Sequence, residues 1–161
     1  MISRRTISRR HILLGVGCLT FLAGCDNADA TPIAMTVHRD AGCGCCEQWV
    51  RALRADGRFA VTMTDDPNMP EFKRRAGVPA DLASCHTGLV GAYVIEGHVP
   101  PDDIARLLTT RPPEATGLAV PGMPVGSPGM EMPDDRRDQF DVIAFEASGR
   151  RSVFARYASM P

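Results

Sequence analysis

The chain has 161 residues, the usual length of a single domain. It is 44% hydrophobic and 23% charged, a composition typical of soluble globular proteins and unlike that of disordered or fibrous chains. Residues 1–24 contain four Arg and no acid, so the remainder holds 14 basic against 19 acidic residues and a net charge near −5. An acidic remainder lacks the basic patch that nucleic acid requires, which excludes a nucleic-acid-binding function.

The first 24 residues have the pattern of an export signal. Arginine pairs at 4–5 and 9–10 precede an apolar run over 12–24, which is too short and too rich in Gly for a transmembrane span. The sequence around the second pair also resembles a twin-arginine motif. We therefore expect residues 1–24 to be a signal peptide that directs the protein out of the cytoplasm.

A lipid anchor is expected where this signal ends. Residues 22–25 read Leu-Ala-Gly-Cys and resemble a lipobox, in which Cys25 would carry the lipid. Asp26 and Asn27 resemble the pair that retains lipoproteins at the inner membrane. Ordinary cleavage after Ala30 is the alternative. We expect a linker at 25–32 and a periplasmic domain at 33–161, anchored to the inner membrane through Cys25.

Periodicity and turn residues predict the elements of the domain in chain order. The first half is expected to contain a strand at 33–38, a helix from Cys45 that ends before Gly57, a strand at 59–63 and a short helix at 68–76. The second half is expected to contain one long or two short strands at 87–95, a turn at 96–97 that begins a partner strand at 98–99, a helix at 101–108, an aperiodic loop at 112–135, and a hairpin of strands 140–145 and 152–157.

The order of these elements resembles the thioredoxin fold, in which reactive cysteines lie at the amino end of the first helix. We therefore predict an α/β thioredoxin-like sandwich with an added C-terminal β-hairpin and a long Gly/Pro/Met-rich loop.

Four cysteines remain once Cys18 is removed with the signal and Cys25 is lipidated: Cys43, Cys45, Cys46 and Cys85. The helix amino terminus favours thiolates over thiols, because its free N–H groups carry partial positive charge. Glycines at 42 and 44 allow the loop to curl until several sulfurs face one point. Because thiolates so close together repel one another, the pattern predicts a bound cation.

Cys85 and His86 precede the third predicted strand, which in thioredoxin-like folds faces the cysteines of the first helix. A cis-proline usually follows there, and Thr87 stands in its place. This departure argues against ordinary disulfide exchange with peptides. It also brings a fourth sulfur, and the His86 imidazole as a candidate ligand, towards the cluster.

The softness of the ligands points to the metal. Thiolates and thioethers select Cu(I), with zinc as the main rival. Met123 and Met130 lie in the Gly/Pro/Met-rich loop and are candidate further ligands, although methionines also serve as apolar fillers. His38 and His98 are isolated in the sequence and are interpreted as strand or surface residues.

Three alternatives to a copper cluster follow from the same cysteines. The first is structural disulfides, with Cys43–Cys46 leaving Cys45 and Cys85 to pair. The second is a thiol–disulfide oxidoreductase that uses Cys43 as nucleophile and Cys46 as resolving thiol. The third is a zinc-stabilised interaction module, although zinc ligands are usually spaced two to four residues apart.

Several motifs together resemble the CopG-like copper-resistance family. They are Gly-Cys-Gly-Cys-Cys at 42–46, Ser-Cys-His-Thr at 84–87, Val-Ile-Glu-Gly-His-Val-Pro at 94–100, Gly-Leu-Ala-Val-Pro-Gly-Met-Pro at 117–124 and Gly-Ser-Pro-Gly-Met at 126–130. The resemblance covers about residues 33–157.

This resemblance implies a thioredoxin-like fold and a multinuclear, cysteine-bridged copper cluster in the periplasm. The matching cysteines are Cys43, Cys45, Cys46 and Cys85, and His86, Met123 and Met130 lie within matching motifs. Such a protein would hold Cu(I) for copper resistance by storing it, passing it to other periplasmic copper-handling proteins, or cycling it between Cu(I) and Cu(II). The last role would make it an enzyme, and we favour metal binding.

Overall fold

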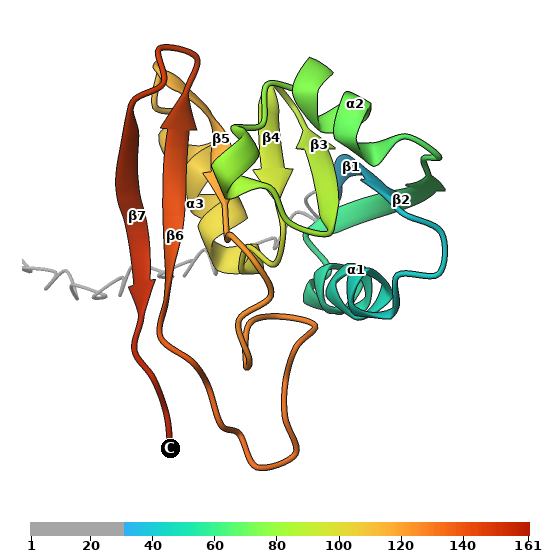
Figure 1. Ribbon diagram of the computed structural model, residues 1–161, viewed down its shortest axis with the longest axis vertical. Coiled ribbons are helices and arrows are strands. Elements are labelled where there is room, and N and C mark those ends of the chain that lie inside the picture. The colour runs from blue at the N-terminus through green and yellow to red at the C-terminus, as the bar shows by residue number, and fades with distance from the viewer. Residues whose placement is uncertain (1–30) are drawn as a thin grey trace, which may run out of the picture.

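The computed structural model describes residues 31–161, which form a seven-stranded mixed sheet with helices packed on it (Figure 1). The expected signal peptide and Cys25 lie outside the described residues. The elements are β1 (Ile33–Arg39), α1 (Gly44–Asp56), β2 (Phe59–Asp65), α2 (Met69–Arg75), η1 (Ala80–Leu82), β3 (His86–Val90), β4 (Tyr93–Glu96), α3 (Pro101–Thr110), β5 (Ala115–Ala119), β6 (Phe140–Glu146) and β7 (Arg151–Tyr157).

The thioredoxin-like part is formed by β1 to β4. In the sheet order β2-β1-β3-β4-β5-β6-β7, β1 is parallel to β2 and antiparallel to β3, and β3 is antiparallel to β4. A core of apolar side chains joins this sheet to α1 and α3. On the other face, Phe72 of α2 stacks on His38 of β1 with ring centroids 3.9 Å apart. The mixed α/β architecture is therefore the predicted one.

Helix α1 forms where its apolar spacing predicts. Its buried residues Cys46, Trp49, Val50 and Leu53 recur at three- and four-residue intervals, so they share one face and pack against the sheet. Gly57 ends the helix with φ +81°, a left-handed conformation that lets its N–H reach the Arg54 carbonyl. The first turn of α1, which carries Cys45 and Cys46, therefore belongs to a helix that is packed against the sheet.

Strand β5 is a correction to the expected aperiodic loop over 112–135. It lies parallel to β4 and antiparallel to β6, so the addition to the thioredoxin-like part has three strands, including the predicted hairpin β6–β7. Because β5 is an interior strand covered on both faces, its sequence does not alternate. Gly117 sits against the Val94 carbonyl and the Phe145 ring, where a larger side chain would not fit.

The connection after β4 also differs from the prediction. β3 and β4 form a hairpin that turns at Gly91 and Ala92, whereas Gly97 and His98 form a bend that leads into α3. The expected partner strand at 98–99 is therefore wrong. The Pro100-Pro101 pair that follows starts α3 and leaves no room for a strand.

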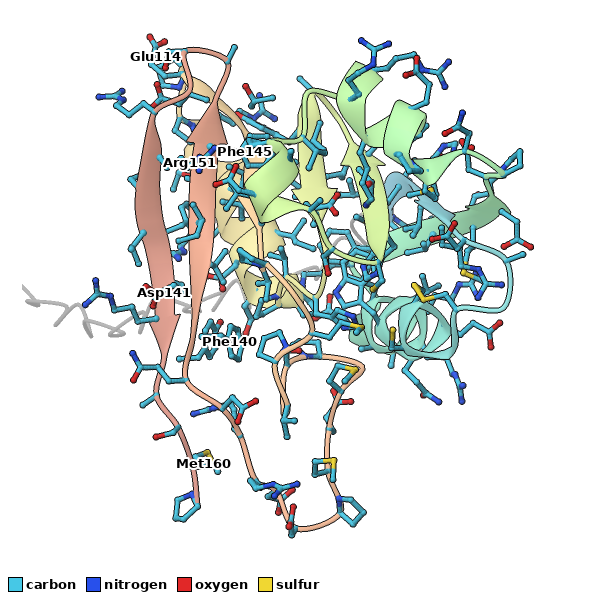
Figure 2. All side chains as sticks on the ribbon, in the orientation of Figure 1. Glu114, Phe140, Asp141, Phe145, Arg151 and Met160 are labelled. Carbon is cyan, nitrogen blue, oxygen red and sulfur yellow. A yellow bond between two sulfur atoms is a disulfide. The ribbon has the colours of Figure 1, made fainter. Side chains whose placement is uncertain are left out.

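The hairpin β6–β7 forms one side of the molecule (Figure 2). Phe140, near the end of β6 closest to the long loop, stacks on Tyr157 with ring centroids 4.7 Å apart, and Phe145 lies buried towards the other end. Among the described helices, none has the length and apolar character needed to cross a membrane.

Candidate metal centre

The loop between β1 and α1 is held by a buried arginine. Arg39, the last residue of β1, donates hydrogen bonds to the Cys43 carbonyl at 2.9 Å and to the carboxylates of Glu47 and Asp65, each at 2.9 Å. Its side chain is 8% exposed. These contacts fix Cys43 at the start of α1, where the helix places Cys45 and Cys46 in its first turn.

The structure brings the four predicted cysteines together. Their sulfurs all lie within 4.8 Å of one another. Cys43 and Cys46 are joined by a disulfide, and Cys45 and Cys85 are free. Cys45 Sγ lies 3.5 Å from Cys43 Sγ and 3.7 Å from Cys85 Sγ.

These separations match those expected for ligands of one metal ion. Sulfurs bound at about 2.3 Å around a tetrahedral ion lie roughly 3.8 Å apart. The Cys45–Cys85 distance of 3.7 Å meets this value without any movement of the chain. A site that used all four sulfurs would additionally need the Cys43–Cys46 bond to be reduced by two electrons.

Two buried imidazoles lie beside Cys85. His86 Nδ1 and His98 Nε2 are each 3.3 Å from Cys85 Sγ, and both histidines are fully buried. The interpretation of His98 as a strand or surface residue is therefore wrong. No periodic pattern around His98 predicts this contact, because the bend after β4 brings the residue to Cys85. The signal that could have indicated it is the position of His98 within the motif at 94–100.

Burial sets the charge of these groups. Loss of solvent lowers the pKa of His86 well below its ordinary value, with the neighbouring His98 as the next cause, and burial likewise lowers the pKa of His98. Both rings are therefore neutral, which is the form that binds metals. Burial, reinforced by Cys45, raises the pKa of the Cys85 thiol to about 12, so a cation is needed to stabilise its thiolate.

A buried carboxylate anchors both sides of the Cys85-His86 pair. Glu96 is fully buried and accepts hydrogen bonds from the Ser84 N–H at 2.5 Å and the Thr87 hydroxyl at 2.7 Å. Lys73 of α2 neutralises it from 2.6 Å. The segment 84–87 is thus tied to β4 through residues directly before and after the two metal-binding candidates.

The Gly/Pro/Met-rich loop covers the cluster. Met123 Sδ lies 3.8 Å from Cys45 Sγ, and its side chain is 53% exposed. The Ser84 hydroxyl donates to the Gly122 carbonyl at 2.5 Å, which joins the loop to the Cys85 segment. Met130 is half-buried and makes backbone hydrogen bonds within the loop, and the sulfur contact with Cys45 is made by Met123.

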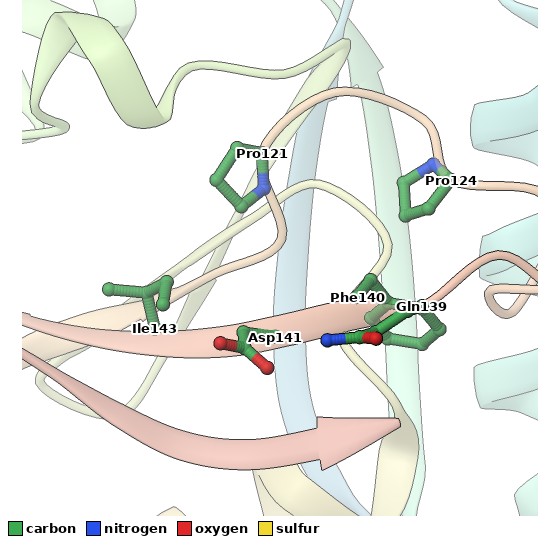
Figure 3. Close-up of a pocket in the computed structure, with 6 residues that line it drawn as sticks. All are labelled: Pro121, Pro124, Gln139, Phe140, Asp141 and Ile143. Atoms are coloured by element: carbon green, nitrogen blue, oxygen red, sulfur yellow. The ribbon is translucent and has the colours of Figure 1, made fainter. Parts of the chain in front are cut away.

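A pocket of about 410 Å³ lies where the loop meets β6 (Figure 3). Its lining includes Pro121 and Pro124, which flank Met123, together with Asp141 and other side chains of β6. None of the lining residues is a cysteine, histidine or methionine. The pocket therefore supplies no soft ligand, so the candidate metal ligands described above are the cysteine cluster, its two histidines and Met123.

Comparison with known proteins gives two kinds of match. A family described as "Protein of unknown function, DUF411" matches residues 82–130, the part of the chain that contains Cys85, both buried histidines and Met123. No curated protein matches the chain.

Two solved structures, forms 1 and 2 of the copper resistance protein CopG, are similar to this chain over nearly their whole length. They are 49% and 48% identical, with TM-scores of 0.74 and 0.73. The match covers 79% and 78% of this chain and 98% of each of those chains. The chain therefore belongs to the family of the copper resistance protein CopG.

Proposed function

We propose that this protein binds Cu(I) through Cys43, Cys45, Cys46 and Cys85, as a cysteine-bridged multinuclear cluster that protects the cell from copper. The observation that carries the proposal is the convergence of four sulfurs within 4.8 Å. Thiolates are soft ligands that select Cu(I) over harder cations. The name of the two solved relatives, copper resistance protein, agrees with this chemistry.

The four sulfurs come from two features of the fold. Cys45 and Cys46 lie at the α1 amino terminus, where the first N–H groups of the helix carry partial positive charge. Cys85 approaches from the segment fixed by Glu96. When bound, Cu(I) would supply the positive charge that allows these thiolates to lie close together in a half-buried site.

Reduction of the Cys43–Cys46 bond precedes full loading. The disulfide takes up two electrons, for example from a dithiol that is itself oxidised to a disulfide, and yields two thiols whose protons leave as copper binds. We further propose that the protein acts in the periplasm, anchored through Cys25. The supporting features are the signal-like residues 1–24 and the lipobox at 22–25.

An anaerobic Cu(I) titration of the reduced chain against a competing Cu(I) chelator, with metal analysis, tests the proposal. Cys18→Ser and Cys25→Ser should be present in every sample, so that the leader cysteines contribute no ligand. We expect more than one copper per chain, with X-ray absorption that shows sulfur ligands and short copper–copper distances. Binding of less than one copper per chain would refute the proposal.

A thiol–disulfide oxidoreductase is the second candidate, and the Cys43–Cys46 disulfide at the start of α1 favours it. In the reduced form, half-buried Cys43 would attack a substrate disulfide and release one thiol. Buried Cys46 would then resolve the mixed disulfide and release the second. This function predicts insulin reduction that Cys43→Ser abolishes, and activity that persists in that variant would exclude it.

A further inference from the structure

A groove of about 550 Å³ lies at the end of the domain where β1 begins. Its lining comes from the residues that lead into β1, the end of α1, the β3–β4 turn and the second half of α3. None of the lining residues is a cysteine or a histidine. Strand β1 carries Ile33 of the groove at its start and Arg39, which holds the cysteine loop, at its end. The groove is therefore separate from the candidate metal centre.

The groove exposes apolar side chains to solvent. Ile33 is 39% exposed, one of the few large apolar side chains of the described residues that are so open, and Leu108 of α3 is half-buried in the same lining. Exposed apolar side chains gathered in one concave surface mark a place where a membrane or an apolar ligand is bound.

The charged residues of the groove are basic. Arg58 and Arg111 are exposed there, and the described lining includes no acid. Arg58 is engaged by Asp56 and Asp102, at 2.6 and 2.5 Å from its Nη2. Arg111 donates only from Nε, to the Leu108 carbonyl at 3.1 Å, so within the described part of the chain its outer guanidinium nitrogens have no partner. They are available to an anion.

Other cavities of the domain differ from this groove in charge. Three of them include an acid in their lining, namely Asp141, Glu131 and Glu146 in turn. Residues 25–161 as a whole carry a net charge near −5. An anionic surface repels such a domain, so a groove with two arginines and no lining acid is the place where the surface can approach.

The chain also enters the domain at this groove. Thr31, the first described residue, belongs to the lining and follows Cys25 by six positions. Six residues span at most about 20 Å, so a lipid on Cys25 would hold the groove close to the bilayer. A short tether raises the effective concentration of its surroundings to about millimolar, which makes a weak contact sufficient.

We propose that this groove binds anionic phospholipids of the membrane that carries the anchor. The headgroup phosphate lies on Arg111, and the adjoining apolar part of the lipid lies on Ile33 and Leu108. The inference rests on the anchor at Cys25 in the proposed function and involves no residue of the copper cluster. A guanidinium group suits a phosphate because its planar fork donates two parallel hydrogen bonds to two phosphate oxygens.

Site-specific photocrosslinking of the full chain tests the proposal. Benzoylphenylalanine replaces either Thr109, which lines the groove, or Thr110, which lines a different cavity. The two residues are a matched pair, because both are exposed on α3 and both hydroxyls donate to the carbonyl four residues earlier. The chain is placed in nanodiscs of phosphatidylcholine, with or without phosphatidylglycerol, and irradiated. Mass spectrometry then measures the lipid adducts.

The adduct at position 109 should be at least about fivefold more abundant with phosphatidylglycerol than without it. This is the factor expected for one basic side chain near an anionic surface. Position 110 should give little adduct in either disc. Equal yields at the two positions would overturn the proposal, as would a yield at position 109 that does not depend on phosphatidylglycerol.

Arg111→Glu, combined with the probe at position 109, should lower the adduct at least about fivefold. Arg75→Glu is the control, because it makes the same change of charge at an exposed arginine of α2 that does not line the groove. It should leave the yield unchanged. Should circular dichroism show that Arg111→Glu is unfolded, Arg111→Asn replaces it, since Asn tolerates the left-handed backbone of this position. An undiminished yield in the folded Arg111 variant would refute the proposal.

The same spectra identify any other occupant of the groove. A crosslink from position 109 to a second copy of the chain, or to the lipid on Cys25 of the same chain, would overturn the proposal.

Two further measurements separate this inference from the proposed function. Reduced Arg111→Glu should bind as many Cu(I) ions as the wild type, because Arg111 lies outside the copper cluster; a loss of copper from the wild type as well would concern the cluster and leave the groove intact. Mass spectrometry shows whether Cys25 is lipidated. If Cys25 carries no lipid but position 109 gives the phosphatidylglycerol-dependent adduct, the anchor is wrong and the groove stands. If Cys25 is lipidated and that adduct is absent, the groove is wrong and the anchor stands.

Discussion

At the scale of single residues, Glu96 combines two tasks in one buried carboxylate. It neutralises Lys73 and accepts hydrogen bonds from both sides of the Cys85-His86 pair. Glu96→Ala should lower the free energy of unfolding by about 3–5 kcal/mol, because it leaves the largely buried ammonium group without its partner. Urea denaturation followed by circular dichroism measures this loss.

The matched control for Glu96→Ala is Arg74→Met. This variant also breaks a salt bridge to a glutamate, but the bridge lies at the surface. The Arg74 side chain is 72% exposed where it pairs with Glu71, so water screens the interaction. Its loss should stay within about 0.5 kcal/mol. Equal losses in the two variants would show that Glu96 contributes no more than a surface charge does.

Gly129 determines how closely the loop packs on α1. A methyl group at this position would meet the Trp49 backbone nitrogen at 2.6 Å and the Cys45 carbonyl oxygen at 3.0 Å. Gly129→Ala should therefore lift the loop from the helix and make Cys45 react faster with a thiol reagent such as a disulfide dye. Stopped-flow absorbance measures the rate.

Gly149→Ala is the control for the loop. Gly149 has nearly the same backbone angle, φ +85° against +86°, but has no atom within 4 Å of the added methyl group. Gly149→Ala should lower the free energy of unfolding by about 1–2 kcal/mol, the cost of a non-glycine residue at positive φ. The rate at which Cys45 reacts with the thiol reagent should stay unchanged. A rate that rises equally in both variants would mean that loss of stability, not displacement of the loop, exposes Cys45.

At the scale of elements, β5 depends on the absence of a side chain at one position. A methyl group on Gly117 would overlap the Val94 carbonyl of the neighbouring strand and contact the Phe145 ring. Gly117→Ala should lower the free energy of unfolding by about 3 kcal/mol or more, since backbone atoms cannot move aside easily. Gly44→Ala, in open space on α1, should instead stabilise by about 0.4–1 kcal/mol.

Elements with a local signal in the sequence could be predicted, and elements defined only by their neighbours in the fold could not. Helix α1 and the hairpin β6–β7 have local signals, namely apolar residues at helical spacing, Gly57 as a stop and a turn at 148–149. Strand β5 has no such signal, because its small residues fit an interior position that only the neighbouring strands define. The same holds for the bend at His98, whose course is set by packing between β4 and α3.

The residues of the candidate metal centre likewise separate into those with a signal in the sequence and those without one. The three cysteines at 43–46 are visible because their spacing is unusual, and Cys85 follows from the predicted fold. The contact of His98 with Cys85 spans 13 positions and needs coordinates. Sequence left the state of Cys43 and Cys46 open between thiolates and a disulfide, because the same spacing suits both; the structure contains the disulfide.

At the scale of the whole molecule, copper binding should stabilise the fold, since the proposed cysteine ligands come from two separate elements, the start of α1 and the segment before β3. A ligand that binds the folded chain alone, at 100 times its dissociation constant, stabilises by about 2.7 kcal/mol. For a domain of this size the melting temperature should rise roughly 5–10 °C. Differential scanning calorimetry of the reduced chain with and without Cu(I) measures the shift.

Removal of the metal should reverse this effect. A Cu(I) chelator added to the loaded chain should return the melting temperature to that of the reduced apo chain. The Cys45→Ser variant should gain less from copper, because Cys45 is the sulfur that lies near both Cys43 and Cys85. An unchanged melting temperature on loading would contradict ligation by separate elements.

The direction of β1 has a consequence for access to the metal. The strand begins at Ile33, next to the linker, and ends at Arg39, whose side chain supports the cysteine loop. Seven residues of strand at about 3.3 Å each place these two ends roughly 20 Å apart. In a chain tethered through Cys25, as proposed, the cysteine loop would therefore lie at the end of β1 remote from the tether, where soluble copper donors and acceptors could reach it.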